Sequence, residues 1–174
     1  MQNSDYVKGV VVDTGPLLIH AASIFENGRL LKDAVTPLKI PETEAKNLAI
    51  MIDRLFSTVK RILVTPYVLA EFCNYAQRTF GLKDNQLIRF MDTYTEFLLK
   101  LKEWQCEKDE LIAFEKSLKL CFTDSSVAFA SKRERIPLIT IDGKLVEFCK
   151  SQGIEAKHIY FEIYLGENPF KKPL

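Results

Sequence analysis

Apolar residues follow two patterns along the chain, and together these patterns predict an α/β domain. Short continuous runs rich in Val, Ile and Leu occur at 7–13, 61–66, 137–142 and 156–161. Such runs are typical of parallel strands covered on both faces. Between them, apolar residues recur every three or four positions, which is the spacing of one helix face. Strands that alternate with helices in this way favour a mainly parallel central sheet.

The predicted helices fill most of the chain between these runs. In the stretch from Ala45 to Val59 the apolar positions step by three and four, and Thr65-Pro66 has the residue types of a helix cap and first turn. The segment 26–42 contains Asn-Gly and two prolines and is predicted to be mainly loop, with room for a short helix. We predict helices at 16–25, 45–59, 66–81, 87–101, 111–121, 122–136 and 143–152, with 87–101 and 111–121 forming a helical hairpin.

Length and composition fit one globular unit. The 174 residues include 47% hydrophobic and 27% charged residues, ordinary values for a folded domain. We predict a single domain over residues 1–165 and a mobile tail over 166–174. The net charge of +1 argues against a protein that binds nucleic acid through its bulk charge, so any contact with phosphates must be local.

Cysteine usage and the N-terminal sequence predict a soluble cytoplasmic protein. The four cysteines are widely spaced without a C-x-x-C pair, so neither a zinc site nor a disulfide framework is indicated. We interpret them as buried thiols in a reducing compartment. Asp5 and Lys8 interrupt any signal-peptide pattern, and no apolar run approaches the roughly 18 residues of a membrane span.

Histidine is scarce, which directs attention to carboxylates. His20 and His158 are the two histidines of the chain, and His158 is predicted at the surface or at a strand end. This scarcity disfavours Ser-His-Asp or Cys-His catalysis and histidine-rich metal sites. An enzyme with this sequence would therefore rely on acidic side chains.

Two predicted strands end on an aspartate. Asp13 follows "GVVV" and Asp142 follows "PLITI". Because ligands of open α/β sheets bind beyond the carboxyl ends of the strands, both acids are expected at a ligand site. The alternative is that each carboxylate caps the helix that follows it, and either residue alone leaves that question open.

Two further acids lie near the starts of predicted helices. Glu71 lies on or beside an apolar stripe formed by Val68, Phe72 and Tyr75, although an edge position or an ion pair would also account for it. Asp124 lies in "CFTDSSVAFAS", where Thr123, Asp124 or Ser125 could each cap the helix.

Taken together, these four acids predict a cation site. Four carboxylates in one cleft would repel one another unless cations were bound. Oxygen ligands without His or Cys suit Mg²⁺ or Mn²⁺, and such metals activate water and stabilise charge on a phosphodiester.

Four sequence motifs, taken in their order along the chain, resemble those of a known family. "VVVDTGPLL", "TPYVLAEFCN", "FTDSSVAFAS" and "LITID" together resemble the PIN-domain family over roughly residues 7–160. The sequence looks most like the VapC-type ribonucleases of toxin–antitoxin pairs. The resemblance implies a PIN-like three-layer α/β/α sandwich with a mainly parallel sheet. It also implies a Mg²⁺- or Mn²⁺-dependent endoribonuclease, with RNA as substrate and an antitoxin protein as candidate partner. Independently of the resemblance, the predicted helical hairpin is a candidate interface for a homodimer.

The same resemblance assigns roles to individual residues. Asp13, Glu71, Asp124 and Asp142 match the acidic catalytic residues of the family. Asp13, Asp124 and Asp142 would lie nearest the metal, and Glu71 would be a ligand or would orient water. Thr14 and Thr140 match polar residues that support the acids.

Other residues and functions stay open at this stage. Lys144 and Asn74 are candidates for contacting substrate, and the basic run Lys132, Arg133 and Arg135 is either a solvated helix end or a phosphate contact. One alternative function is a PIN-fold module that binds RNA or protein without turnover. A haloacid-dehalogenase-like phosphatase is disfavoured, because Thr14-Gly15 follows Asp13 where that chemistry needs a second aspartate.

Overall fold

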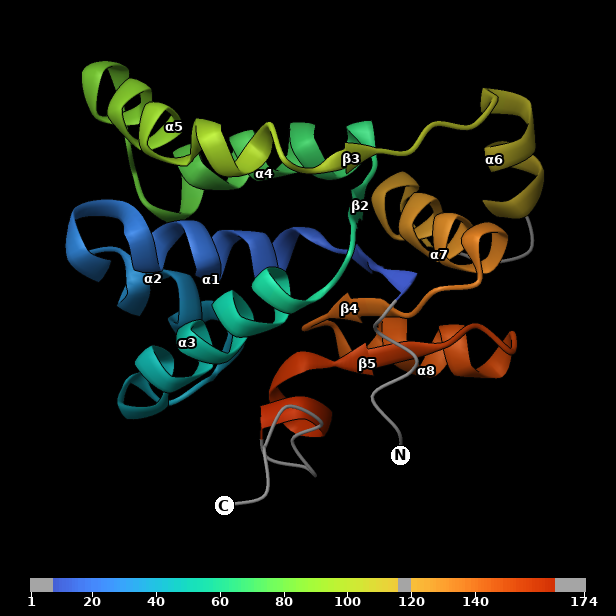
Figure 1. Ribbon diagram of the computed structural model, residues 1–174. Coiled ribbons are helices and arrows are strands. Elements are labelled where there is room, and N and C mark those ends of the chain that lie inside the picture. The colour runs from blue at the N-terminus through green and yellow to red at the C-terminus, as the bar shows by residue number, and fades with distance from the viewer. Residues whose placement is uncertain (1–7, 116–119, 165–174) are drawn as a thin grey trace.

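A computed structural model describes residues 8–115 and 120–164, and it confirms the α/β prediction (Figure 1). In these residues a five-stranded sheet has the order β3-β2-β1-β4-β5, and every neighbouring pair is parallel. The strands are β1 (Val10–Val12), β2 (Ile62–Val64), β3 (Lys102–Glu103), β4 (Leu138–Thr140) and β5 (Ala156–His158). The predicted tail at 166–174 lies outside the described residues.

The central strand β1 is covered on both faces, as its apolar sequence predicts. Val10, Val11 and Val12 are all fully buried. Val10 lies opposite Ile62 of β2, and Val12 lies opposite Ile139 of β4. A strand without a solvent face needs apolar side chains at successive positions rather than at alternate ones.

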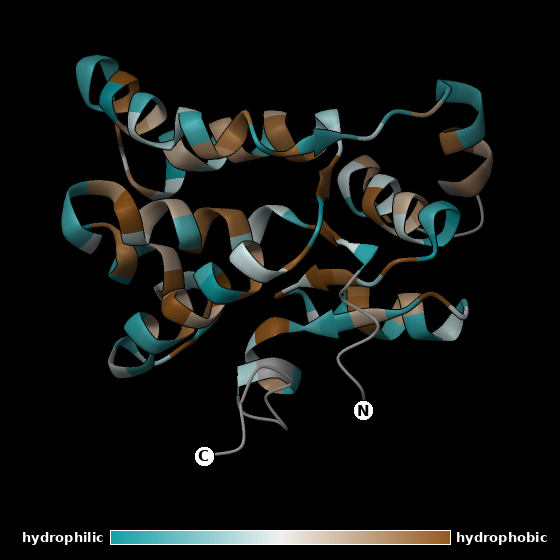
Figure 2. Ribbon diagram, viewed as in Figure 1, coloured by the Kyte–Doolittle hydropathy of each residue, from teal (hydrophilic) through white to brown (hydrophobic). Residues whose placement is uncertain are grey.

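Helices flank the sheet on both sides, as in a three-layer sandwich. Among them, α7 packs on β1 and β4, α8 packs on β4 and β5, and α1 contacts α3 and α4. Hydrophobic residues colour β4 and much of β2, hydrophilic residues colour β3 and most of β5, and the two kinds alternate along the helices (Figure 2). The helices are α1 (Thr14–Ile24), α2 (Leu31–Val35), α3 (Glu42–Thr58), α4 (Pro66–Thr79), α5 (Asp84–Leu98), α6 (Lys108–Glu115), α7 (Phe122–Glu134) and α8 (Gly143–Ser151), with shorter turns η2 (Phe25–Gly28), η3 (Thr36–Leu38) and η4 (Ile159–Tyr164).

The region between the second and third predicted strands differs from the predicted helical hairpin. The strand β3 lies between α5 and α6, and it pairs with β2. Figure 1 shows α5 and α6 at opposite sides of the molecule, and α6 packs on α7. The hairpin prediction was wrong because Lys102 and Glu103 form a strand between the two helices. Both residues are charged, so the hydrophobic pattern of the sequence does not indicate a strand there. The end of the predicted helix at 116–119 lies outside the described residues.

The segment 26–42 contains the short helix that the prediction allowed, and it has more helical turns than expected. It contains α2 and the two short turns η2 and η3. Leu31, Ala34 and Val35 are buried there. These apolar residues, spaced three and four apart, anchor the segment to the core.

The expectation for the cysteines was wrong, and the expectation for His158 is confirmed in its strand-end alternative. In the described residues only Cys149 is buried, whereas Cys73 and Cys121 are exposed and Cys106 is intermediate. His158 does lie at the end of β5, but it is only 7% exposed. None of the helices in the described ranges is both long and apolar enough to span a membrane.

Candidate carboxylate site

The four predicted acids line one pocket where the strand order reverses. Strands β2 and β3 lie on one side of β1, and β4 and β5 lie on the other. The crevice between β1 and β4 is therefore the place where an open α/β sheet binds its ligand. The pocket has a volume of about 350 Å³, and its lining includes Asp13, Thr14, Gly15, Glu71, Tyr75, Asp124, Ile141 and Asp142.

Asp13 is the most buried of these acids, with 7% of its surface exposed. Its Oδ1 accepts a hydrogen bond from the Thr14 backbone N–H (2.7 Å), and its Oδ2 accepts one from the Thr140 hydroxyl (2.6 Å). Burial raises the pKa of Asp13 to about 6; hydrogen bonds from Thr140 and Thr14 lower it, and the charges of Asp124 and Glu71 raise it. The helix-cap alternative is thus realised, and the same carboxylate also faces the pocket.

Thr140 connects the two acids that follow the strands. Besides donating to Asp13, its Oγ1 accepts a hydrogen bond from the Asp142 backbone N–H (3.0 Å). Asp142 is exposed, and its Oδ1 caps α8 by accepting from the N–H groups of Lys144 (2.7 Å) and Leu145 (3.2 Å). The hydroxyl of Thr140 therefore fixes the Asp13 side chain and the backbone of Asp142 at the same time.

Glu71 reaches the pocket from α4 through Thr14. The Thr14 hydroxyl donates to Glu71 Oε2 at 2.6 Å, so this contact joins the first turn of α1 to the middle of α4. Thr14 contacts Asp13 through its backbone and Glu71 through its side chain. Glu71, which lies beside the apolar stripe of α4, is thus held by a hydrogen bond from the Thr14 hydroxyl.

Asp124 does not cap α7, and neither do Thr123 and Ser125. The cap is Cys121, whose sulfur accepts a hydrogen bond from the Asp124 backbone N–H at 3.4 Å. The Asp124 carboxylate is left to face the pocket. Burial raises its pKa; the hydrogen bond with Cys121 lowers it, and the nearby charges of Asp142 and Glu71 raise it.

The donor set fits a hard divalent cation by its chemistry, since all four side chains offer carboxylate oxygens. Burial is the main reason why the pKa of Asp13 and the pKa of Asp124 are raised, and the charges of the neighbouring acids raise both further. A bound cation would offset both effects by stabilising the ionised carboxylates. However, across residues 8–115 and 120–164, no three His, Cys, Asp or Glu side chains are arranged so that they could hold a metal ion. Oxygens of Asp13, Glu71 and Asp142 are turned instead toward hydroxyl and N–H donors of the protein.

Tyr75 and Gly15 are two of the pocket-lining residues that were not predicted from the sequence. Tyr75 is 46% exposed and lines the pocket, whereas the sequence placed it on the inward stripe, a position that Ala76 takes. Burial raises the pKa of Tyr75, and the charges of Glu71, Asp13 and Asp124 raise it further. Gly15 is the second, because a Cβ there would overlap the side chain of Ile141.

Ser125, beside Asp124, is fully buried. Its hydroxyl is the one buried side-chain oxygen or nitrogen without a hydrogen-bond partner in the part of the chain that the structure describes. A buried hydroxyl without a partner carries a desolvation cost of about 1–3 kcal/mol.

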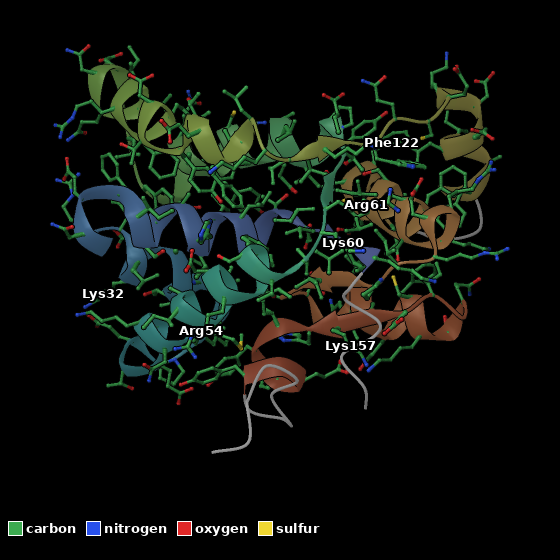
Figure 3. The ribbon with its side chains drawn as sticks, viewed as in Figure 1. Lys32, Arg54, Lys60, Arg61, Phe122 and Lys157 are labelled. Carbon is green, nitrogen blue, oxygen red and sulfur yellow. The ribbon has the colours of Figure 1, made fainter. Side chains whose placement is uncertain are left out.

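The predicted substrate contacts lie outside this pocket lining. Lys144 and Asn74 are both exposed. The basic run is at the C-terminal end of α7, away from Asp124, and Arg133 there forms an ion pair with Glu110. Figure 3 labels Lys32, Arg54, Lys60, Arg61 and Lys157, which are spread over the face shown. Two of these are paired, Lys32 with Glu42 and Arg61 with Glu134.

Comparisons with known proteins show the fold alone. No known sequence family matches the chain, and no curated protein matches it in sequence. Among solved structures, the chain is similar to the crystal structure of PAE2754 from Pyrobaculum aerophilum, with a TM-score of 0.54 and 16% sequence identity. The match covers 88% of this chain and 92% of that one. The α/β architecture is therefore shared over nearly the whole of both chains.

Proposed function

We propose that this protein is a PIN-type endoribonuclease that depends on Mg²⁺ or Mn²⁺. One observation carries the proposal: four acids from four separate segments line one pocket beside the two strands where the sheet order reverses. Two of them are partly desolvated and carry raised pKa values, which is a property of functional carboxylates. The sequence motifs that resemble the PIN-domain family contain all four.

Asp13, Asp124, Asp142 and Glu71 would hold the cation. When bound, a divalent cation lowers the pKa of a water molecule and stabilises negative charge on a phosphodiester. The protein's own part is to keep the acids ionised and in place. Thr140 donates to Asp13, which favours its charged form, and Thr14 holds Glu71 toward the pocket.

The test is cleavage of single-stranded RNA by the purified protein with added Mg²⁺ or Mn²⁺, and again with a chelator. We expect cleavage only with metal, and a loss of at least about a hundredfold in the folded Asp13→Asn variant. Asp109→Asn is the matched control, because Asp109 is an exposed acid on α6 outside the pocket. Full cleavage by folded Asp13→Asn would refute the assignment.

The alternative function is a binding module of the same fold that holds RNA or a protein without turnover. The observation in its favour is that no three potential ligands are arranged for a metal within the described ranges. RNA binding without metal-dependent cleavage would support it over the nuclease. The nuclease proposal also includes a toxin role with a cognate antitoxin, a homodimer and a cytoplasmic location. Co-purification with a partner protein would test the toxin role.

A further inference from the structure

The two helices that carry Glu71 and Asp124 also carry exposed aromatic side chains. In the described residues, four aromatic side chains are more than a third exposed: Tyr67, Tyr75, Phe122 and Phe161. The first three come from α4 and α7, the two helices that also carry Glu71 and Asp124. Large exposed aromatics are costly to leave in water, so their position beside a charged pocket calls for an explanation.

Tyr67 and Phe122 form a pair of parallel rings at the starts of the two helices. Their centroids are 6.0 Å apart, and the ring planes differ by 13°. Tyr67 is 38% exposed and Phe122 is 44% exposed, so the pair keeps part of its surface open to a ligand. Figure 3 shows Phe122 at the upper end of α7. We call these two side chains the aromatic platform.

The platform adjoins the carboxylates along α4. On α4, Tyr67, Glu71 and Tyr75 are spaced four residues apart and therefore lie along one face of the helix. On α7, Phe122 is the first residue of the helix that carries Asp124, and its ring packs against Tyr67 of α4. The platform also borders a smaller pocket of about 170 Å³, which Tyr67 lines together with Trp104 and Gln105. Trp104 directly follows β3, so this second pocket lies at the same edge of the sheet.

We propose that the aromatic platform stacks a nucleobase of a single-stranded RNA whose neighbouring phosphodiester lies at the carboxylate pocket. This inference rests on the proposed nuclease function and names the residues that would position its substrate. Every base has a flat π-face, so stacking on aromatic rings binds single strands with little sequence preference. Bases inside a duplex are already stacked on one another and cannot reach such a platform.

The charge of the protein supports a stacked base over other occupants. The net charge is +1, and the basic run of α7 lies at the opposite end of that helix from the platform. The bulk charge of the protein therefore supplies little affinity for RNA, and a stacked base would add attraction that does not depend on that charge. The carboxylates would repel an acidic peptide or a phosphate that has no bound cation. A nucleobase is neutral, so it can stack on the platform without this repulsion, and a cation at the carboxylates would then bind the neighbouring phosphate.

The test is binding of a labelled single-stranded oligoribonucleotide of about twelve nucleotides, measured by fluorescence anisotropy in Mg²⁺ with phosphorothioate linkages to slow cleavage. Tyr67→Leu and Phe122→Leu keep apolar bulk but remove the flat ring. We expect each to weaken binding about tenfold, whereas Tyr67→Trp should retain wild-type affinity. Leu99→Ala is the control, because Leu99 is 80% exposed and precedes β3 at the other edge of the sheet.

A second measurement identifies the stacked base. Replacing one nucleotide at a time by an abasic site should weaken wild-type binding at one position and should have no further effect there in Tyr67→Leu. The base-stacking proposal would be refuted if the wild type, Tyr67→Leu and Phe122→Leu bound the oligoribonucleotide equally well. It would also be refuted if the wild type bound no single-stranded RNA. Separate cleavage assays on ordinary RNA distinguish the two proposals. If the leucine variants lose RNA binding and the wild type never cleaves RNA, the base-stacking proposal is supported and the nuclease proposal is refuted.

Discussion

Replacing Thr140 by valine removes one hydroxyl from the centre of the carboxylate site and leaves the shape of the side chain nearly unchanged. Thr140 is fully buried, and its hydroxyl donates to Asp13 Oδ2 at 2.6 Å. The pKa of Asp13 is already raised to about 6 by burial, and the Thr140 hydrogen bond is the largest effect that lowers it. Without this donor, the ionised form of Asp13 should be less stable in the folded protein.

The size of the effect follows from the strength of a hydrogen bond to a charged group. Such a bond contributes about 1.5–3 kcal/mol, and about 1.4 kcal/mol corresponds to one pH unit. Thr140→Val should therefore raise the pKa of Asp13 further, by about 1 to 2 pH units. A larger share of Asp13 would then be protonated at neutral pH. Since a protonated carboxyl group is a poor ligand for Mg²⁺, more metal would be needed to stabilise the variant.

The assay is an NMR titration of the side-chain carboxyl carbon of Asp13 in metal-free buffer, for the wild type and the variant. Thr140→Ser is the matched control, because serine keeps the donor and should return the pKa toward the wild-type value. The Asp142 backbone N–H also bonds to Thr140, so the amide resonance of Asp142 reports whether the backbone moves. An unchanged pKa of Asp13 in a folded Thr140→Val protein would refute the reasoning about this hydrogen bond.

Three further predictions concern the same pocket. In chelator, the raised pKa of Asp13 should destabilise the fold above pH 6 by up to about 3 kcal/mol. The stability advantage of Asp13→Asn in urea unfolding should therefore grow as the pH rises from 4 to 6; a constant difference would contradict this sign. Gly15→Ala should displace Ile141 and reduce metal-dependent thermal stabilisation, whereas an unchanged stabilisation would show that Ile141 moves freely. Ser125→Ala should leave stability unchanged or raise it by about 1 kcal/mol in urea unfolding, because the hydroxyl has no partner; a clear loss of stability would reveal one.

The parts of the fold that could be predicted are those where burial decides the residue type. β1 is fully buried, so every position is apolar and the strand is evident in the sequence. Thr65 before Pro66 marked the start of α4, and the Thr65 hydroxyl does accept a hydrogen bond from the Val68 N–H at 3.4 Å. The four acids could be brought to one edge of the sheet because parallel strands share the direction of their carboxyl ends.

The parts that could not be predicted depend on contacts between distant segments. β3 is an exposed pair of charged residues, and only its pairing with β2 makes it a strand. The sulfur of Cys121 caps α7, although Thr123, Asp124 and Ser125 nearby have side-chain oxygens that could have capped it. Tyr75 faces the pocket rather than the core because the buried stripe of α4 continues from Phe72 by four residues to Ala76, not by three to Tyr75, and tertiary packing decides between these two spacings.

The two edge strands limit how copies of this chain can associate. β3 has two residues and β5 has three, and charged side chains lie on both. Such short, charged edges present few unpaired N–H and C=O groups to another chain, which discourages growth of the sheet from one molecule into the next. A homodimer of this protein should therefore form through helix surfaces, and each copy would keep its own five-stranded sheet and its own carboxylate pocket.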